Sequence, residues 1–179
     1  MSRREICIDI GCGSGRSYMF NPSCPLHFET VLIDVEYPSR DVARFVSSRG
    51  SLHFVVASVE MLPLRSSCVD RGYAVHVLEH VSDLRRALLQ VWRVMKPGAL
   101  LHVVFPSLLS VDIDADPTHR QRMTFLRFVK IARSCGFSVI LPVRAGSKLP
   151  RIVRRLLSIF MNMVVDHLSL VLRSEKRES

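Results

Sequence analysis

Apolar and polar positions follow one another along the chain in segments typical of alternating strands and helices. Short apolar runs bounded by turn residues predict buried strands, and apolar residues recurring every three or four positions predict helices. The predicted strands are 5–10, 31–35, 53–57, 71–77, 99–105, 137–141 and 167–173. The predicted helices are 39–46, 82–95, 124–134 and 149–165. This order favours an α/β fold in which helices cover both faces of a mostly parallel sheet.

The helix boundaries carry their own signals. Ser39 and Ser82 precede apolar periodic segments and are predicted N-caps, and Pro97-Gly98 is expected to end the helix over 82–95. Two long connections, 16–29 and 106–121, have no regular pattern. Long loops in compact domains are often functional, so both are candidates for a site.

Length and composition are those of a folded globular chain. The chain has 179 residues, of which 48% are hydrophobic and 23% charged. We expect one domain over 1–173 and a flexible basic tail over 174–179. The formal net charge of +9 favours association with phosphates, RNA or acidic substrates but does not bear on the fold.

The cysteines indicate neither a disulfide framework nor a metal site. There are five, an odd number, and neither a C-x-x-C pair nor a histidine cluster at metal-ligand spacing accompanies them. We expect reduced cysteines in a cytoplasmic protein. No signal-peptide pattern opens the chain, and the apolar segment 156–172 is interrupted by polar residues and too short to span a bilayer. A soluble protein is therefore predicted.

The strongest local signal is the glycine-rich run I-C-I-D-I-G-C-G-S-G after the first strand. Glycines let the backbone turn sharply and approach a ligand closely. Asp34 ends the next strand, 23 positions after Gly11, where a carboxylate accepts hydrogen bonds from a ribose in nucleotide-binding sheets. The third glycine of a dinucleotide motif would fall on Arg16, so the spacing disfavours NAD. Asp9 suits a zwitterionic ligand such as S-adenosylmethionine. A purely structural turn is the alternative.

Five sequence blocks in order resemble the small class I methyltransferases of the type 11 family. They are I-D-I-G-C-G-S-G (8–15), V-E-M-L-P-L (59–64), V-L-E-H-V-S-D-L (77–84), R-V-M-K-P-G-A-L-L (93–101), and D-P-T-H (116–119) with a later C-G-F (135–137). The resemblance implies a Rossmann-like three-layer sandwich around a seven-stranded sheet of order 3-2-1-4-5-7-6, with the last strand antiparallel. It also implies S-adenosylmethionine as cofactor.

The resemblance further implies the parts of the cofactor site. The glycine turn would line the methionine half, Asp34 would hold the ribose, Val35 would pack on the adenine, and Ala74 would offer its carbonyl to the ammonium group. The implied cofactor residues are Asp9, Gly11, Cys12, Gly13, Gly15, Asp34, Val35, Ser58, Val59, Ala74 and His76.

Several features depart from the family pattern. Position 58 is usually acidic, and Ser58 makes a weaker hydrogen bond to adenine. Pro22 and Pro25 are expected to shorten the first helix, and we expect no counterpart of the helices that precede the family's first strand. We expect part of the cover over the cofactor to come from the 106–121 loop.

The acceptor side is predicted less sharply, because an activated methyl group needs mainly alignment and exclusion of water. His119 and His76 are the candidate catalytic bases. His76, Glu79, His80 and His119 are the candidate substrate contacts, although Glu79 and His80 also suit a structural role at the start of the following helix.

The preferred function is therefore S-adenosylmethionine-dependent methyl transfer to an O or N acceptor, a small molecule, by a cytoplasmic monomer or homodimer without a membrane span. Two alternatives stay open. One is an RNA or protein methyltransferase that uses a basic face, including Arg151, Arg154 and Arg155 of the predicted 149–165 helix. The other is a non-catalytic module that binds adenosylmethionine. That basic helix also suits a solvated surface or a partner.

Overall fold

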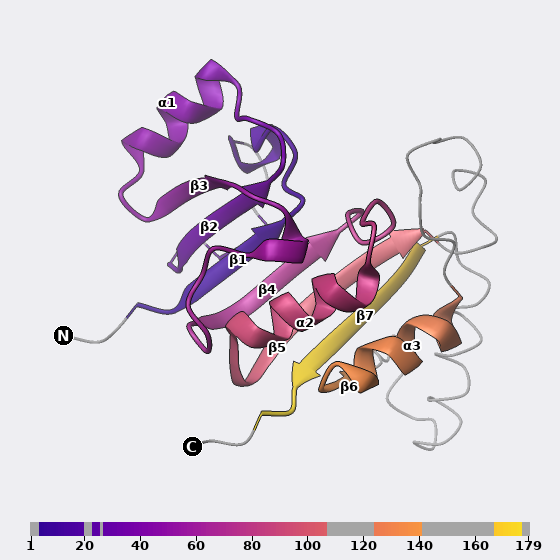
Figure 1. Ribbon diagram of the computed structural model, residues 1–179. Coiled ribbons are helices and arrows are strands. Elements are labelled where there is room, and N and C mark those ends of the chain that lie inside the picture. Colours follow the sequence, from indigo (N-terminus) through magenta and orange to yellow (C-terminus); the bar gives the residue numbers. More distant parts are fainter. Residues whose placement is uncertain (1–3, 20–22, 26, 107–123, 141–166, 177–179) are drawn as a thin grey trace, which may run out of the picture.

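The computed structural model describes residues 4–19, 23–25, 27–106, 124–140 and 167–176 (Figure 1). The strands are β1 (Ile6–Ile10), β2 (Glu29–Asp34), β3 (Leu52–Val56), β4 (Val69–Val75), β5 (Met95–Pro106), β6 (Phe137–Ile140) and β7 (His167–Ser174). The helices are α1 (Arg40–Ser48), α2 (Leu84–Val94) and α3 (Phe125–Ser134), with short 3-10 turns η1 (Arg16–Met19) and η2 (Val59–Met61). The predicted helix over 149–165 lies outside the described residues.

The seven strands form one sheet of order β3-β2-β1-β4-β5-β7-β6. The neighbouring pairs from β3 to β5 are parallel, and β7 is antiparallel to both β5 and β6, as its reversed arrow in Figure 1 shows. The predicted order and the antiparallel last strand are confirmed. The crossing from β1 to β4 leaves the carboxyl ends of β1, β2 and β4 side by side, which is where open α/β sheets bind ligands.

The helices form because their apolar residues recur on one side. In α2 the buried residues Leu84, Ala87, Leu88 and Val91 follow helical spacing, and α3 buries Phe125, Phe128 and Ala132 in the same way. Figure 1 shows both helices on one side of the sheet. Together with Ile8 and Ile10 of β1 they build the larger core.

The opposite face of the sheet has a smaller core. Because side chains alternate along a strand, Cys7 points away from the larger core, and it packs with Tyr18, Cys24, Phe28 and Leu32. Residues of η1 and α1 cover this cluster, which completes the predicted third layer. Cys7 and Cys24 form a disulfide, so the prediction that all five cysteines are reduced is wrong for these two.

Two predicted helix signals are also corrected. Asp83, not Ser82, is the N-cap of α2, because the Asp83 carboxylate accepts a 2.9 Å hydrogen bond from the Arg86 amide. Pro97-Gly98 does not separate α2 from the next strand, since β5 begins at Met95. The pairing of β4 with β5 shifts register here, and Gly98 adopts a φ of +72°. Every other predicted boundary of a described element lies within two residues of the observed one.

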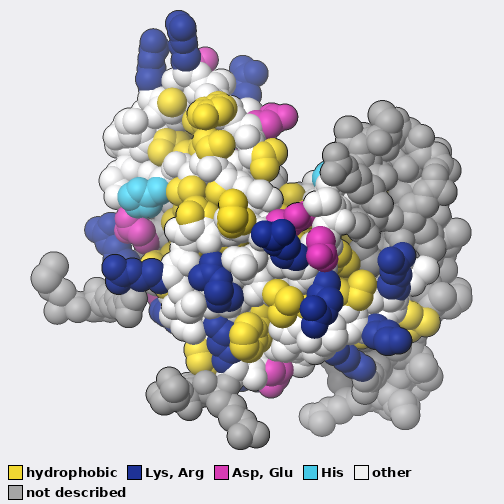
Figure 2. Space-filling model, in the orientation of Figure 1, with side chains coloured by type: hydrophobic (Ala, Val, Ile, Leu, Met, Phe, Trp, Pro, Cys, Tyr) yellow, Lys and Arg dark blue, Asp and Glu magenta, His cyan; other side chains and the backbone are white. Residues whose placement is uncertain are grey.

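The basic charge is scattered on the face of the molecule that Figure 2 draws. On the face drawn in Figure 2, Lys and Arg side chains lie among acidic and apolar ones and do not merge into one stripe. Within the part of the chain that the structure describes, no helix is both long and apolar enough to cross a bilayer.

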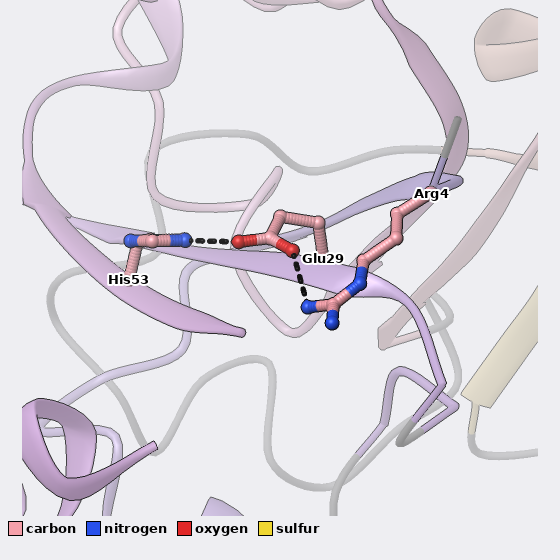
Figure 3. Close-up of polar contacts among 3 residues, drawn as sticks. All are labelled: Arg4, Glu29 and His53. Carbon is pink, nitrogen blue, oxygen red and sulfur yellow. Dashed lines mark hydrogen bonds and ion pairs between the residues drawn. The ribbon is translucent and has the colours of Figure 1, made fainter. Parts of the chain in front are cut away.

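An ionic cluster joins the first three strands at the end of the sheet opposite the glycine turn (Figure 3). Glu29 of β2 contacts Nε2 of His53 at 2.7 Å and a guanidinium nitrogen of Arg4 at 3.4 Å. The hydrogen bond from His53, with help from Arg4, holds the pKa of Glu29 below its ordinary value. These exposed contacts add little stability, but they connect the start of β2 to β3 and to the residues just before β1.

Gly136 links α3 to β6 in a way that a side chain would disrupt. Its φ is +90°, its carbonyl accepts a 3.1 Å hydrogen bond from Trp92 Nε1, and an added Cβ would lie 2.5 Å from that nitrogen. We expect Gly136→Ala to lower the free energy of unfolding by about 2–3 kcal/mol. The exposed Gly50 has open space around its Cβ position, so Gly50→Ala should change it by less than about 0.5 kcal/mol. Urea titration measures both, and equal costs would contradict this reading.

Candidate functional site

The glycine turn after β1 is packed too tightly for side chains at its start. Gly11 has a φ of +72°, and a Cβ there would lie 2.4 Å from Cβ of Val77. Its amide donates a 2.8 Å hydrogen bond to the Ile33 carbonyl of β2. Gly13 and Gly15 also have positive φ, and a Cβ at Gly13 would meet nothing within 4 Å. The absence of a side chain at Gly11 therefore lets the turn pack against Val77, whereas Gly13 borders open space.

Asp34 holds the same turn from the neighbouring strand. Its Oδ2 accepts a 2.6 Å hydrogen bond from the Gly13 amide, and its Oδ1 accepts one of 3.0 Å from the Glu36 amide. A carboxylate has about four acceptor positions, so each oxygen retains capacity for a further donor. Asp34 thus fixes the loop and still offers acceptors to a ligand.

A cavity of about 350 Å³ opens between these elements, at the small end of the range for small-molecule sites. Its walls come from the ends of β1 and β2, from η2, and from the segment between β4 and α2. The lining residues are Ile10, Gly11, Ile33, Asp34, Val35, Ala57, Ser58, Val59, Glu60, Val77, His80, Val81 and Ser82.

The cavity brings together part of the predicted site. Gly11, Asp34, Val35, Ser58, Val59 and His80 line it. Asp9, Cys12, Gly13, Gly15, Ala74, His76 and Glu79 are not among its lining residues. Ala74 and Asp9 are both buried, and His119 lies outside the described residues. The residues predicted to bind adenosine thus line the cavity, whereas most of those predicted to bind the methionine half lie in the glycine turn at its edge.

Glu60 is a wall residue that the sequence analysis missed. It lies 22 residues before Ser82 in the sequence. Its carboxylate accepts hydrogen bonds from the Ser82 amide at 2.7 Å and the Asp83 amide at 3.0 Å. The Ser82 hydroxyl also donates to it. These bonds, led by the Asp83 amide, lower the pKa of Glu60. The negative charge at the start of α2 is favourable, and it holds two cavity walls together. No local sequence signal connects an acid 22 residues away with the start of this helix, so sequence reasoning could not have found it.

Asp9 lies beneath the turn, only 5% exposed. Burial raises its pKa to about 6, an effect that hydrogen bonds from the Tyr18 and Ser23 side chains oppose and nearby Asp34 adds to. A buried carboxylate with two side-chain donors is a negative charge held in place close to the glycine turn. It is well suited to a cationic ligand group.

His76 is the backbone outlier at the end of β4. It is not a glycine, yet its φ is +52°, and its amide is anchored by a 2.8 Å hydrogen bond to the Val104 carbonyl. The ring is 44% exposed, and its Nδ1 lies 3.3 Å from Oε1 of Glu79, whose side chain is 3% exposed. The other carboxylate oxygen, Oε2, is buried with no hydrogen-bond partner among the described residues. Such strain and incomplete pairing are typical of functional positions.

Cys12 and possible metal ligands are the further candidate groups for chemistry at this edge. Burial, together with Asp9 and Asp34, raises the pKa of Cys12, so its thiol stays protonated and is a poor nucleophile. The described residues contain no group of three His, Cys, Asp or Glu side chains that could hold a metal ion.

Gly11 and Gly13 offer a matched test of the turn. Both have positive φ, but only an added Cβ at Gly11 collides with Val77. We expect Gly11→Ala to lower the free energy of unfolding by about 3 kcal/mol and Gly13→Ala by about 1–2 kcal/mol, the cost of the left-handed backbone alone. Chemical denaturation measures the difference. Equal losses would show that the contact with Val77 is not a constraint.

Comparison with known proteins bears on the same region. The model of the methyltransferase-domain family, type 11, matches residues 8–103. An O-methyltransferase of Aspergillus nomiae is 27% identical over 104 residues, 56% of this chain and 46% of that protein. An O-methyltransferase of Pyrenophora dematioidea is 31% identical over 101 residues, which cover 54% of this chain and 37% of that protein. A tRNA (carboxymethyluridine(34)-5-O)-methyltransferase of Arabidopsis thaliana is 30% identical over 54% of this chain and 23% of its own length.

Solved structures share the fold at low identity. A Haloferax volcanii putative methyltransferase, in complex with the Trm112 methyltransferase activator, has a TM-score of 0.71 at 16% identity, over 98% of this chain and 86% of that one. A Burkholderia thailandensis N1-methyltransferase with bound S-adenosylhomocysteine has a TM-score of 0.66 at 15% identity, over 97% of this chain and 72% of that one. The chain spans less than half the length of the curated relatives described above. Since the family model covers more than half of the chain, this protein belongs to the type 11 methyltransferase-domain family.

Proposed function

We propose that this chain binds S-adenosylmethionine and transfers its methyl group to an oxygen or nitrogen of a small molecule. The observation that carries the proposal is the cavity between the glycine turn and the carboxyl ends of β2 and β3, with Asp34 and Ser58 on its walls. The cofactor supplies an activated methyl group when it is bound. The protein must then bind it, align an acceptor and exclude water.

The cavity residues suit an adenosine. The Asp34 carboxylate is the acceptor for the two ribose hydroxyls, and Val35, which is 66% exposed beside it, offers an apolar surface for the adenine ring. Ser58 has its hydroxyl engaged by the Glu60 amide at 3.2 Å and can still contact an adenine amino group, alongside Val59. Val35 is then covered when the site is filled.

The glycine turn suits the methionine half. The space beside Gly13 is where a side chain would obstruct a ligand, and the fixed negative charge of Asp9 lies under the turn. We assign Gly11, Cys12, Gly13 and Gly15 to this half through their backbone. The Ala74 carbonyl at the end of β4 is the proposed acceptor for the ammonium group.

His76 and Glu79 supply the proposed base. If Glu79 accepts the Nδ1 proton of His76, the other ring nitrogen, Nε2, is the atom proposed to take a proton from the acceptor. The adjacent residue, Val77, contacts the glycine turn, so His76 lies one residue from the proposed cofactor loop. His80 lines the cavity and is proposed to contact the substrate, whereas the buried Glu79, predicted as a second substrate contact, is proposed to act through His76. His119 stays a predicted second base.

RNA is the alternative acceptor. The tRNA-modifying relative and the net charge of +9 favour it, whereas the scattered basic residues in Figure 2 do not. The arginines of the 149–165 segment lie outside the described residues and remain predictions. A non-catalytic module that binds the cofactor is the third reading, and whether the chain is a monomer or a homodimer remains a prediction as well.

Binding of S-adenosylhomocysteine tests the cofactor proposal. Asp34→Asn keeps the size of the side chain but removes its charge, and we expect affinity to fall by about 1–3 kcal/mol through loss of charged hydrogen bonds. Titration calorimetry measures it. Asp41→Asn, an equal change on the exposed start of α1, is the control and should leave affinity unchanged. Binding of NADH in place of S-adenosylhomocysteine by the unmodified protein would contradict the proposal.

Methyl transfer tests the base. Labelled adenosylmethionine, incubated with small-molecule and RNA fractions of a cell extract, identifies the acceptor. With that acceptor, His76→Gln should lower kcat about 10²- to 10⁴-fold near neutral pH without altering affinity for S-adenosylhomocysteine. His53→Gln changes a remote exposed histidine and should leave kcat unchanged. Full activity of His76→Gln would remove His76 from the mechanism, and label found in RNA alone would favour the alternative acceptor.

A further inference from the structure

We propose that the Cys7–Cys24 disulfide makes cofactor affinity depend on thiol redox state, because it holds Tyr18 and Ser23 as positioning residues on Asp9. This inference rests on the proposed function, since it assumes that the glycine turn and Asp9 form the methionine half of the cofactor site.

The bridge closes a loop that contains the whole glycine turn. It joins Cys7 of β1 to Cys24, 17 positions later, and Gly11, Gly13, Gly15 and η1 all lie between the two cysteines. Among the described residues of this loop, the single turn of η1 is the regular structure that follows β1. A covalent closure therefore restricts the freedom of a segment with few hydrogen bonds of its own.

Contacts connect the bridge to Asp9 in two short steps. The Cys24 amide donates a 3.2 Å hydrogen bond to the Tyr18 hydroxyl, and Tyr18 in turn hydrogen-bonds the Asp9 carboxylate. Ser23, the residue before the bridged cysteine, also hydrogen-bonds Asp9. At the other end, the Tyr18 amide donates to the Gly15 carbonyl at 3.1 Å. Displacing Cys24 would thus loosen both donors of Asp9 and the end of the glycine turn.

The bridge is buried, with Cys7 0% and Cys24 2% exposed, in the same cluster as Tyr18. A small dithiol reaches it when the loop opens locally. In the exchange the S–S bond breaks, the dithiol forms its own disulfide, and its two electrons and two protons pass to Cys7 and Cys24. Re-oxidation by a disulfide reagent reverses the step.

The charge on Asp9 gives a second readout. Its pKa of about 6 is raised by burial and by Asp34, and is opposed by the Tyr18 and Ser23 donors. The Cys12 thiol, also close, stays neutral. Because ionised Asp9 favours a cationic ligand, affinity should rise as pH increases through this pKa. Losing either donor should raise the pKa of Asp9 and move that rise to higher pH.

The test is titration calorimetry of the full chain with S-adenosylhomocysteine, before and after treatment with dithiothreitol, with the bridge assayed by mass spectrometry. We expect about tenfold weaker binding after reduction. Cys7→Ala/Cys24→Ala should bind like the reduced protein in both conditions. Cys68→Ala, at a free and partly buried cysteine, should keep the response of the unmodified protein.

The outcomes separate this inference from the proposed function. Failure of the oxidised protein to bind S-adenosylhomocysteine would overturn both. Equal affinity with the bridge intact and broken, or absence of the bridge from the oxidised protein, would overturn the redox inference alone. If the double variant does not fold, the reduced and re-oxidised unmodified protein gives the same comparison.

Tyr18→Phe distinguishes positioning from simple packing. It removes the hydroxyl but keeps the ring, so the pH at which affinity rises should increase while the melting temperature changes little. Tyr73→Phe, a similar change beside Asp9 in the sheet register, should leave the pH profile unchanged. An unchanged profile in Tyr18→Phe would remove Tyr18 as a positioning residue.

Discussion

The contact between the Gly11 backbone and Val77 is the constraint on which the candidate site depends. Because no side chain separates them, the segment after β4 closes against the turn after β1, and both face the end of β2. The Ile33 carbonyl and the Asp34 carboxylate then bind amides of the turn. These contacts hold the carboxyl ends of β1, β2 and β4 together at one edge of the sheet. The cavity is the space between the segments that follow these strands. A larger residue at position 11 would separate β1 from the β4 connection and remove one wall.

Much of this arrangement could be predicted because it depends on local signals. The spacing of Leu84, Leu88 and Val91 predicts α2, and the glycines of the turn occupy backbone conformations that disfavour other residues. Asp34 was predicted from its distance along the chain to the turn. The family resemblance supplied the strand order, which local periodicity alone does not determine.

What could not be predicted depends on contacts between distant segments. Glu60 accepts hydrogen bonds from the Ser82 and Asp83 amides just before α2, yet it lies 22 residues before Ser82, in the separate turn η2. Cys7 and Cys24 form a bridge between β1 and the segment that follows η1, and an odd cysteine count obscures this pairing. The adjacency of His76 and Glu79 follows from a left-handed residue at the end of β4, where the sequence predicted that the strand would continue to 77.

The matched region explains why relatives of different named acceptors resemble this chain. The family model covers residues 8–103, from within β1 to within β5, and this stretch includes every residue that lines the cavity. Backbone turns form much of that cavity, and Asp34 and Glu60 hold those turns by accepting hydrogen bonds from backbone amides. Substitutions at other positions leave these contacts in place. At about 30% identity, the relatives described above match little more than half of this chain. On the proposed function, the stretch matched by the family model would hold the cofactor, and acceptor choice would depend on side chains outside this cavity, such as His76, and on segments beyond residue 103.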